Sequence, residues 1–123
     1  GIYEHINKPL VIKSKYDSHQ FEFSWKNGIY HVYQPLSFDL ETAENITNKS
    51  HLWRSKLEVL SQGVQKFRPF LIIAGPHTKA LKDAAKNAQE ILKSSNVKDV
   101  SLISETDVPA LAEDTRKLMK KAG

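Results

Sequence analysis

Four polar residues in one short stretch are the first candidates for chemistry: Glu22, Ser24, His31 and Tyr33. A histidine that faces a serine could take the hydroxyl proton and so prepare a nucleophile. That chemistry also needs a strained turn that exposes the serine, and N–H groups that stabilise an oxyanion. Ser24 lies in a plain alternating run that offers neither. We therefore interpret the four residues as the polar side of a β-hairpin.

The hairpin is predicted by two alternating runs, residues 20–26 and 29–34, joined by Asn27-Gly28. This dipeptide is the strongest local sign of a two-residue type I′ turn, which would set Trp25 opposite Tyr30. Since side chains alternate along a strand, one face would hold Phe21, Phe23, Trp25, Tyr30 and Val32, and the other Glu22, Ser24, Lys26, Ile29, His31 and Tyr33. We expect the first face to be buried. On the second face we predict a partner-binding surface formed by Glu22, Ile29, His31 and Tyr33.

Metal-dependent nucleases need clustered carboxylates, because two metal ions clamp the attacking and leaving oxygens of the phosphate. The run 10–16 offers Lys13 and Lys15 where a strand aspartate would be needed, and residues 72–75 contain no acid. No acid-x-lysine triplet, the other common nuclease pattern, accompanies Glu22. An active nuclease is therefore not expected. A diverged relative that takes its acids from Asp39, Glu22 or a partner chain stays open as an alternative.

No metal or nucleotide motif is complete elsewhere. The histidines are scattered without the spacing of a metal site, and the sequence has no cysteine to supply a thiolate. Gly75 to Lys79 follows an apolar run and opens a helix, where backbone N–H groups can receive a phosphate. This turn lacks the glycines of the Walker and dinucleotide patterns, so we interpret it as a tight connection. We predict no catalytic residue, no metal and no cofactor, and favour a protein that is not an enzyme.

Lysines on one predicted helix suggest nucleic-acid binding as an alternative. With the basic end of the chain, the predicted contacts are Lys79, Lys82, Lys86, Lys93, Lys120 and Lys121. A row of lysines on one helix face is typical of a surface that follows phosphates. Asp83 and Glu90 lie on the same stripe, each four residues after a lysine, so a solvent-exposed and salt-bridged helix is the favoured explanation of the row.

The periodicity predicts elements in the order βββαβαβα. Strands are expected near residues 10–16, 20–26, 29–34, 69–74 and 97–104. Helices are expected near 42–63, 77–94 and 107–122. The first helix has an apolar stripe of Ile46, Trp53, Leu57, Leu60 and Val64. The strand 69–74 is apolar without alternation, which indicates a strand covered on both faces at the centre of the sheet.

We therefore predict an α/β fold, close to α+β, with one mixed five-stranded sheet that begins with an N-terminal antiparallel hairpin unit. The last two strands bracket a helix and should lie parallel through a right-handed crossover. This succession of elements resembles the ribonuclease H-like fold across nearly the whole chain. The resemblance is one of topology, and it implies no function by itself.

Length and composition fit one domain, 1–123, with residues 1–9 as a lead-in and with the chain as a fragment or terminal domain of a larger protein. No apolar span, signal sequence or cysteine is present, so we expect a cytoplasmic protein without membrane contact. The net charge of +4 leaves room for an acidic partner. We expect a non-catalytic intracellular domain that binds a protein partner or a second copy of itself, with nucleic acid as the alternative partner.

Overall fold

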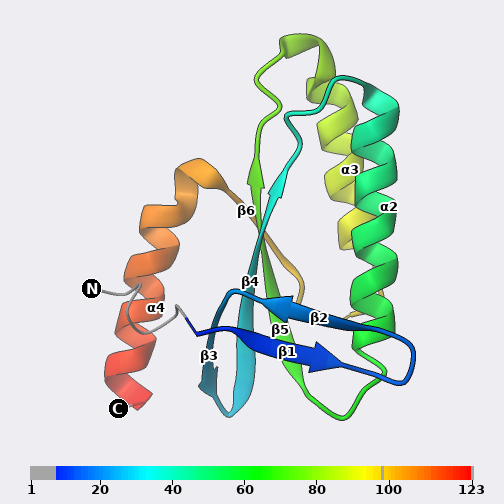
Figure 1. Ribbon diagram of the computed structural model, residues 1–123. Helices are drawn as coiled ribbons and strands as arrows, with labels where there is room; N and C mark the ends of the chain where they lie inside the picture. The colour runs from blue at the N-terminus through cyan, green and yellow to red at the C-terminus, as the bar shows by residue number, and fades with distance from the viewer. Residues whose placement is uncertain (1–7, 98, 123) are drawn as a thin grey trace.

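The computed structural model describes residues 8–97 and 99–122 (Figure 1). Its strands are β1 (Leu10–Lys13), β2 (Ser18–Phe21), β3 (Phe23–Asn27), β4 (Ile29–Ser37), β5 (Phe67–Ala74) and β6 (Ser101–Ser104). Its helices are α2 (Ala43–Leu60), α3 (Lys82–Lys93) and α4 (Val108–Ala122), with short 3-10 turns η1 (Lys79–Leu81) and η2 (Glu105–Asp107). Within these residues, no helix has the length and apolar character needed to span a bilayer.

The central sheet contains β3, β4, β5 and β6 in chain order. β3 and β4 are antiparallel, whereas β4, β5 and β6 run parallel to one another. Parallel neighbours need a crossover, which α2 supplies between β4 and β5 and α3 between β5 and β6. β5 therefore lies between two strands, and the prediction that this apolar run is central to the sheet is confirmed.

Aliphatic side chains fill the side of the sheet that faces α2 and α3. Val32, Leu36 and Leu71 have at most 2% of their surface exposed. The two helices complete this core with Ile46, Trp53, Leu57, Leu60, Ala88 and Leu92. The predicted stripe of the first helix thus does face the sheet as far as Leu60, and it holds the helix in place by burial of apolar surface.

Aromatic side chains cover the opposite side of the sheet, the side on which α4 lies (Figure 1). Trp25 stacks on His31 with ring centroids 4.6 Å apart, and Tyr33 stacks on Phe70 at 4.9 Å. The Trp25 Nε1–H donates a hydrogen bond to the Tyr33 hydroxyl oxygen at 2.9 Å. All four residues are buried. We call Trp25, His31, Tyr33 and Phe70 the aromatic cluster.

β1 and β2 form a separate two-stranded sheet that joins the aliphatic core. Ile12 and Phe21 are fully buried in that core. An ion pair of 3.2 Å between Lys56 Nζ and Asp17 Oδ2 ties the connection between the two strands to α2. The pKa of Asp17 is lowered, because the Ser18 N–H donates a hydrogen bond to this carboxylate and Lys56 lies beside it. Burial of Ile12 and Phe21 therefore holds this small sheet against the core, and the ion pair fixes the connection beside α2.

The predicted five-stranded sheet is wrong. The expected strand 20–26 is divided at Glu22, so that Phe21 belongs to β2 and Phe23 to β3. The described strands make a four-stranded sheet and a two-stranded one. The mixed α/β character is confirmed, whereas the ribonuclease H-like topology is not confirmed by this strand order.

The predicted hairpin register is also wrong, by one residue. Trp25 pairs with His31 and not with Tyr30. A slip of one residue moves side chains to the other face of the sheet. Trp25 and Phe23 therefore lie on the aromatic side, whereas Tyr30 and Val32 contact the aliphatic core.

Candidate binding grooves at the two ends of the sheet

A groove of about 680 Å³ opens at the end of the sheet where β4 and β5 begin. Ile29 is the first residue of β4, and Phe67 is the first residue of β5. The connection from α2 to β5 and the segment before β6 complete its walls. We call this the amino-end groove, and the residues that matter here are Ile29, Val64, Lys66, Phe67, Arg68 and Val97.

Val64 is the most unusual residue of the amino-end groove, because 97% of its surface is exposed. The sequence predicted Val64 as the last inward residue of the first helix, and this prediction is wrong. α2 ends at Leu60, with the Ser61 N–H donating to the Leu57 carbonyl at 2.9 Å. The chain then turns away from the core, so that Val64 lies at the rim of the groove and contributes nothing to the apolar core.

Two cations flank the apolar part of the groove. Lys66 is exposed, whereas Arg68 is half-buried, with its guanidinium carbon 5.2 Å from the centroid of the Phe70 ring. The Nε atom of Arg68 is buried without a hydrogen-bond partner. Asp99 is the acidic residue in the described lining. The groove therefore combines aliphatic contact area with an excess of positive charge.

Close contacts with β1 fix the wall of the groove that carries Val64. The Gln65 side chain accepts a hydrogen bond from the Lys13 N–H at 3.0 Å and donates one to the Val11 carbonyl at 3.1 Å. A Cβ atom on Gly63 would lie only 2.3 Å from the Lys13 carbonyl oxygen, so only glycine allows this approach. The loop is thus held on both sides of Val64 by contacts with β1.

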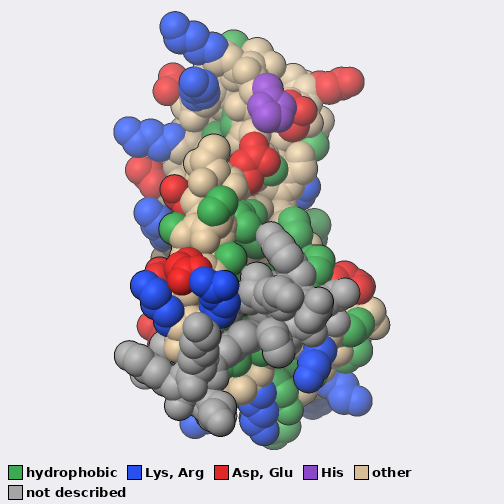
Figure 2. All heavy atoms as spheres, turned by 90° about the vertical axis from the view of Figure 1, so that its left-hand side faces the viewer, with side chains coloured by type: hydrophobic (Ala, Val, Ile, Leu, Met, Phe, Trp, Pro, Cys, Tyr) green, Lys and Arg blue, Asp and Glu red, His purple; other side chains and the backbone are tan. Residues whose placement is uncertain are grey.

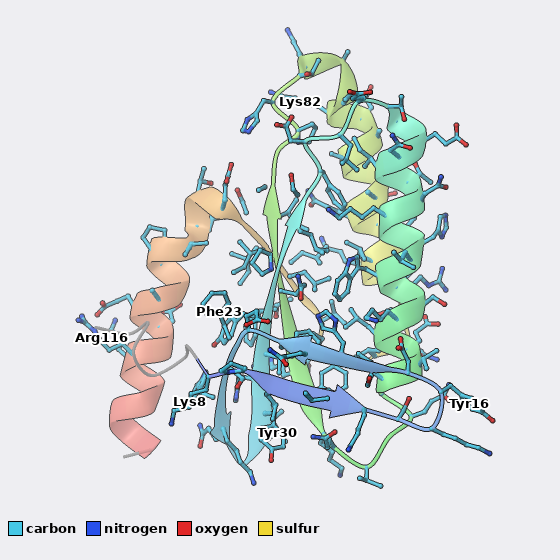
Figure 3. The ribbon with its side chains drawn as sticks, in the orientation of Figure 1. Lys8, Tyr16, Phe23, Tyr30, Lys82 and Arg116 are labelled. Atoms are coloured by element: carbon cyan, nitrogen blue, oxygen red, sulfur yellow. The ribbon has the colours of Figure 1, made fainter. Side chains whose placement is uncertain are left out.

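A second hollow, of about 570 Å³, lies at the carboxyl ends of β5 and β6. Its lining includes Gly75, His77, Lys82, Gln89, Ser104 and Glu105. We call it the carboxyl-end hollow. Figure 3 shows Lys82 beyond the ends of the parallel strands, at the top of the molecule. In sheets with parallel strands, ligands commonly bind in the crevice outside these ends.

The structure divides the four predicted partner-binding residues. Ile29 lies in the amino-end groove. Glu22 is exposed between β2 and β3, where it accepts a hydrogen bond from Gln20 Nε2 at 3.1 Å. His31 and Tyr33 are only 7% and 3% exposed, because both belong to the aromatic cluster. The predicted hairpin surface is therefore not a single free face of this chain.

Burial lowers the pKa of His31, and the charge of Arg68 lowers it further. The Ile29 backbone raises this pKa, as the smallest of the three effects. The Nδ1 atom of His31 has no hydrogen-bond partner although it is buried. The lowered pKa favours the neutral ring, which suits its stacking on Trp25.

The predicted nucleic-acid contacts fall on three elements, η1, α3 and α4. Lys79, Lys82, Lys86 and Lys93 are exposed on η1 and α3. Lys120 and Lys121 belong to α4, and their side chains lie outside the described part of the structure. α3 and α4 lie on opposite sides of the sheet (Figure 1). Figure 2 shows basic and acidic side chains interspersed along the edge of the molecule.

The acids proposed for a diverged nuclease lie on different elements. Asp39 follows β4, where its Oδ2 atom is 3.9 Å from His77 Nε2, and Glu22 lies between β2 and β3. Among the described residues, no group of three or more His, Asp or Glu side chains could hold a metal ion.

Sequence reasoning missed Val64, Lys66 and Arg68 as a group. The sequence did contain a signal. If the helix ends before Gly63, Val64 falls outside the apolar stripe of the helix and stands alone beside Lys66 and Arg68. Comparisons with protein-family models, curated proteins and solved structures find no match for this chain.

Proposed function

We propose that this chain is a non-catalytic interaction domain that binds an acidic and apolar segment of a partner protein in the amino-end groove. The observation that carries the proposal is the 97% exposure of Val64 beside the half-buried Ile29, with Lys66 and Arg68 on the same groove. An exposed aliphatic rim next to an arginine is typical of a protein contact.

The apolar half of the groove supplies the driving force. Burial of a valine side chain that is otherwise exposed contributes roughly 1.5–3 kcal/mol. Val64 starts from almost complete exposure, so nearly all of this gain is available to a partner. Ile29, Phe67 and Val97 extend the same contact area.

The cations select an acidic partner. Arg68 is the better anchor, because its guanidinium is held over the Phe70 ring and so loses less freedom when it meets a carboxylate. A guanidinium can also donate two parallel hydrogen bonds to one carboxylate. Lys66 adds a second positive charge at the rim. The overall charge of +4 favours encounter with an acidic partner as well.

Selection of peptides tests this function directly. The full chain is immobilised, and a display library of random linear peptides is selected against it. We expect the enriched peptides to combine Asp or Glu with Leu, Ile, Val or Phe. Enrichment of basic peptides, or of peptides without any acidic residue, would contradict the proposal.

Matched variants then locate the contact. Val64→Asp and Lys66→Glu should each weaken binding of an enriched peptide by about tenfold or more, as measured by calorimetry. Leu52→Asp and Lys86→Glu are the controls, because Leu52 is 64% exposed on α2 and Lys86 is exposed on α3, both outside the groove. Equal losses in the test and control variants would place the contact elsewhere.

The lysines of η1 and α3 favour nucleic-acid binding as a second candidate. Lys79 and Lys86 are exposed, and within the described residues neither lies within 4 Å of a carboxylate, so the i, i+4 pairs with Asp83 and Glu90 are not formed. Binding of this kind weakens steeply with salt. Lys86→Glu should then weaken binding of single- or double-stranded DNA, while Lys66→Glu should leave it unchanged.

A further inference from the structure

The carboxyl-end hollow is separate from the amino-end groove and has a different chemistry. Its volume of about 570 Å³ lies within the range of roughly 300–1,000 Å³ that small-molecule sites occupy. Its floor is formed by apolar residues of the strands, Ile73, Leu102 and Ile103. Polar side chains from two other segments line its walls, so a ligand here would meet an apolar floor and polar sides.

One wall of the hollow is basic. Lys82 begins α3, and His77 lies in the turn that follows β5. Lys82 is exposed and makes no ion pair with the described residues, so its ammonium group is free to meet an anion. Asp39 lies beside His77, with 3.9 Å between the carboxylate oxygen and Nε2. The negative charge of Asp39 opposes anion binding at His77, so Lys82 is the principal cation of the wall.

The other wall carries hydroxyl and carboxylate groups. Ser104 ends β6, and η2 follows with Glu105, Thr106 and Asp107. The Ser104 and Thr106 hydroxyl oxygens lie 2.9 Å apart, and the Thr106 N–H donates to Ser104 Oγ at 3.3 Å. These contacts hold the turn in shape. The carboxylates of Glu105 and Asp107 accept hydrogen bonds but repel anions.

We infer that the carboxyl-end hollow binds a small phosphorylated polyol, the chemistry shared by sugar phosphates and nucleotides. The phosphate lies at Lys82 and His77, because an ammonium and an imidazole N–H both donate to phosphate oxygens. The hydroxyl groups of the sugar lie at Glu105 and Asp107, since carboxylates accept hydrogen bonds from hydroxyl groups, as an acidic residue of dinucleotide-binding α/β folds does from ribose. The opposite charge of the two walls fixes the direction of the ligand.

Titration of the full chain followed by amide NMR tests the site. The probes are ribose 5-phosphate, AMP, ribose and inorganic phosphate. We expect ribose 5-phosphate or AMP to shift the amides of Gly75, His77 and Ser104, and to bind at least about tenfold more tightly than ribose or phosphate alone. Tighter binding of AMP than of ribose 5-phosphate would identify a nucleotide as the ligand. The reverse order would identify a sugar phosphate.

Two variants separate the walls. Lys82→Gln should weaken ribose 5-phosphate by about tenfold and leave ribose unchanged, while Glu105→Gln should weaken both sugars and leave phosphate unchanged. Lys86→Gln, one turn further along α3 and outside the hollow, is the control. All three positions are exposed, so the fold should tolerate the changes.

Three results would overturn the inference. The first is phosphate binding as tight as that of ribose 5-phosphate, which would show an adventitious ion only. The second is equal loss in all three variants. The third is an absence of amide shifts at the hollow. Val64→Asp should leave this titration unchanged, so a failure here is distinguishable from a failure of the proposed peptide binding.

Discussion

The two sides of the central sheet are built from different kinds of side chain. Towards α2 and α3 the strands present aliphatic residues such as Leu71, which is fully buried. Towards α4 they present the aromatic cluster, with one hydrogen bond between indole and hydroxyl and one buried histidine nitrogen without a partner. The first side is mainly aliphatic, with a few polar groups such as the fully buried Ser50, whereas the second places an indole, a hydroxyl and an imidazole within one buried cluster.

The two sides of the sheet should respond differently to mutation and to pH. Shortening a side chain in an aliphatic core lowers the free energy of unfolding, and the loss increases with the volume of the cavity that remains. The stability of a polar aromatic cluster depends in addition on whether each donor and acceptor has a hydrogen-bond partner, and on the charge of any group that titrates. The aliphatic side should therefore respond mainly to size, and the aromatic side to hydrogen bonding and pH.

The largest effect should come from neighbouring residues of β5 that point to opposite sides. Leu71→Ala should lower the free energy of unfolding by about 2–5 kcal/mol, because it leaves a cavity in the aliphatic core. Ile72→Ala, on the aromatic side, should cost about 1–2 kcal/mol, since Ile72 is only half-buried and part of its surface already meets water. Urea unfolding measures both. Equal losses would mean that the two sides of the sheet are equally packed.

Removal of one hydroxyl from the aromatic cluster should have the next largest effect. Tyr33→Phe leaves the Trp25 Nε1–H without its acceptor, so we expect a loss of about 1–3 kcal/mol in the free energy of unfolding. Tyr30→Phe is the matched control on the other side of the sheet, where the half-buried ring should be almost indifferent to the change. A larger loss at Tyr30 would reverse the comparison.

A smaller effect should follow from pH. The pKa of His31 in the folded chain is below the ordinary value of 6.5, so the unfolded chain binds this proton more readily. Stability is therefore intact above pH 6.5 and falls as the pH drops below it, by less than about 1.4 kcal/mol for each pH unit. Unfolding measured between neutral and mildly acidic pH should show this slope, and His31→Phe should remove it. A slope that survives in His31→Phe would assign it to another group.

The smallest effect should come from the exposed end of the aromatic side. Pro35→Ala should cost at most about 1 kcal/mol, mainly through the greater freedom of the unfolded chain. Its neighbour Leu36 faces the aliphatic core, and Leu36→Ala is the contrasting variant, with an expected loss several times larger. Thermal unfolding of the two variants side by side would check the ratio. A loss of stability in Pro35→Ala as large as that in Leu36→Ala would show that the aromatic side is tightly packed along its whole length.

Helical periodicity predicted the aliphatic side well. The spacing of Trp53, Leu57 and Leu60 placed the first helix on the sheet, and Thr42 caps it by accepting the Asn45 N–H at 3.1 Å. The unbroken apolar run of β5 placed the central strand. Both features follow from apolar patterns within a single segment. Such a pattern predicts the buried face of a helix directly, because successive turns of the helix pack against the same core.

The aromatic side could not be predicted in the same way. The dipeptide Asn27-Gly28 marks a turn, but register depends also on which rings stack across the strands. Here Trp25 stacks on His31, and Phe70 comes from a strand far along the chain to stack on Tyr33. The break at Glu22 is equally hidden, because alternation continues through it while the chain passes from one sheet to another. The grooves escaped prediction for the same reason, since each combines loops from separate parts of the sequence.

The paired hydrogen bonds of Gln65 have a consequence for solubility. Its side-chain amide meets β1 just as a peptide group of an adjoining strand would, and thereby occupies the outward N–H of Lys13 and the outward carbonyl of Val11. The unpaired N–H and carbonyl groups of an edge strand can pair with a strand of another molecule, which is a first step of aggregation. A single glutamine side chain thus pairs with the backbone groups at this edge of β1, so that these groups are not available to a strand of another molecule.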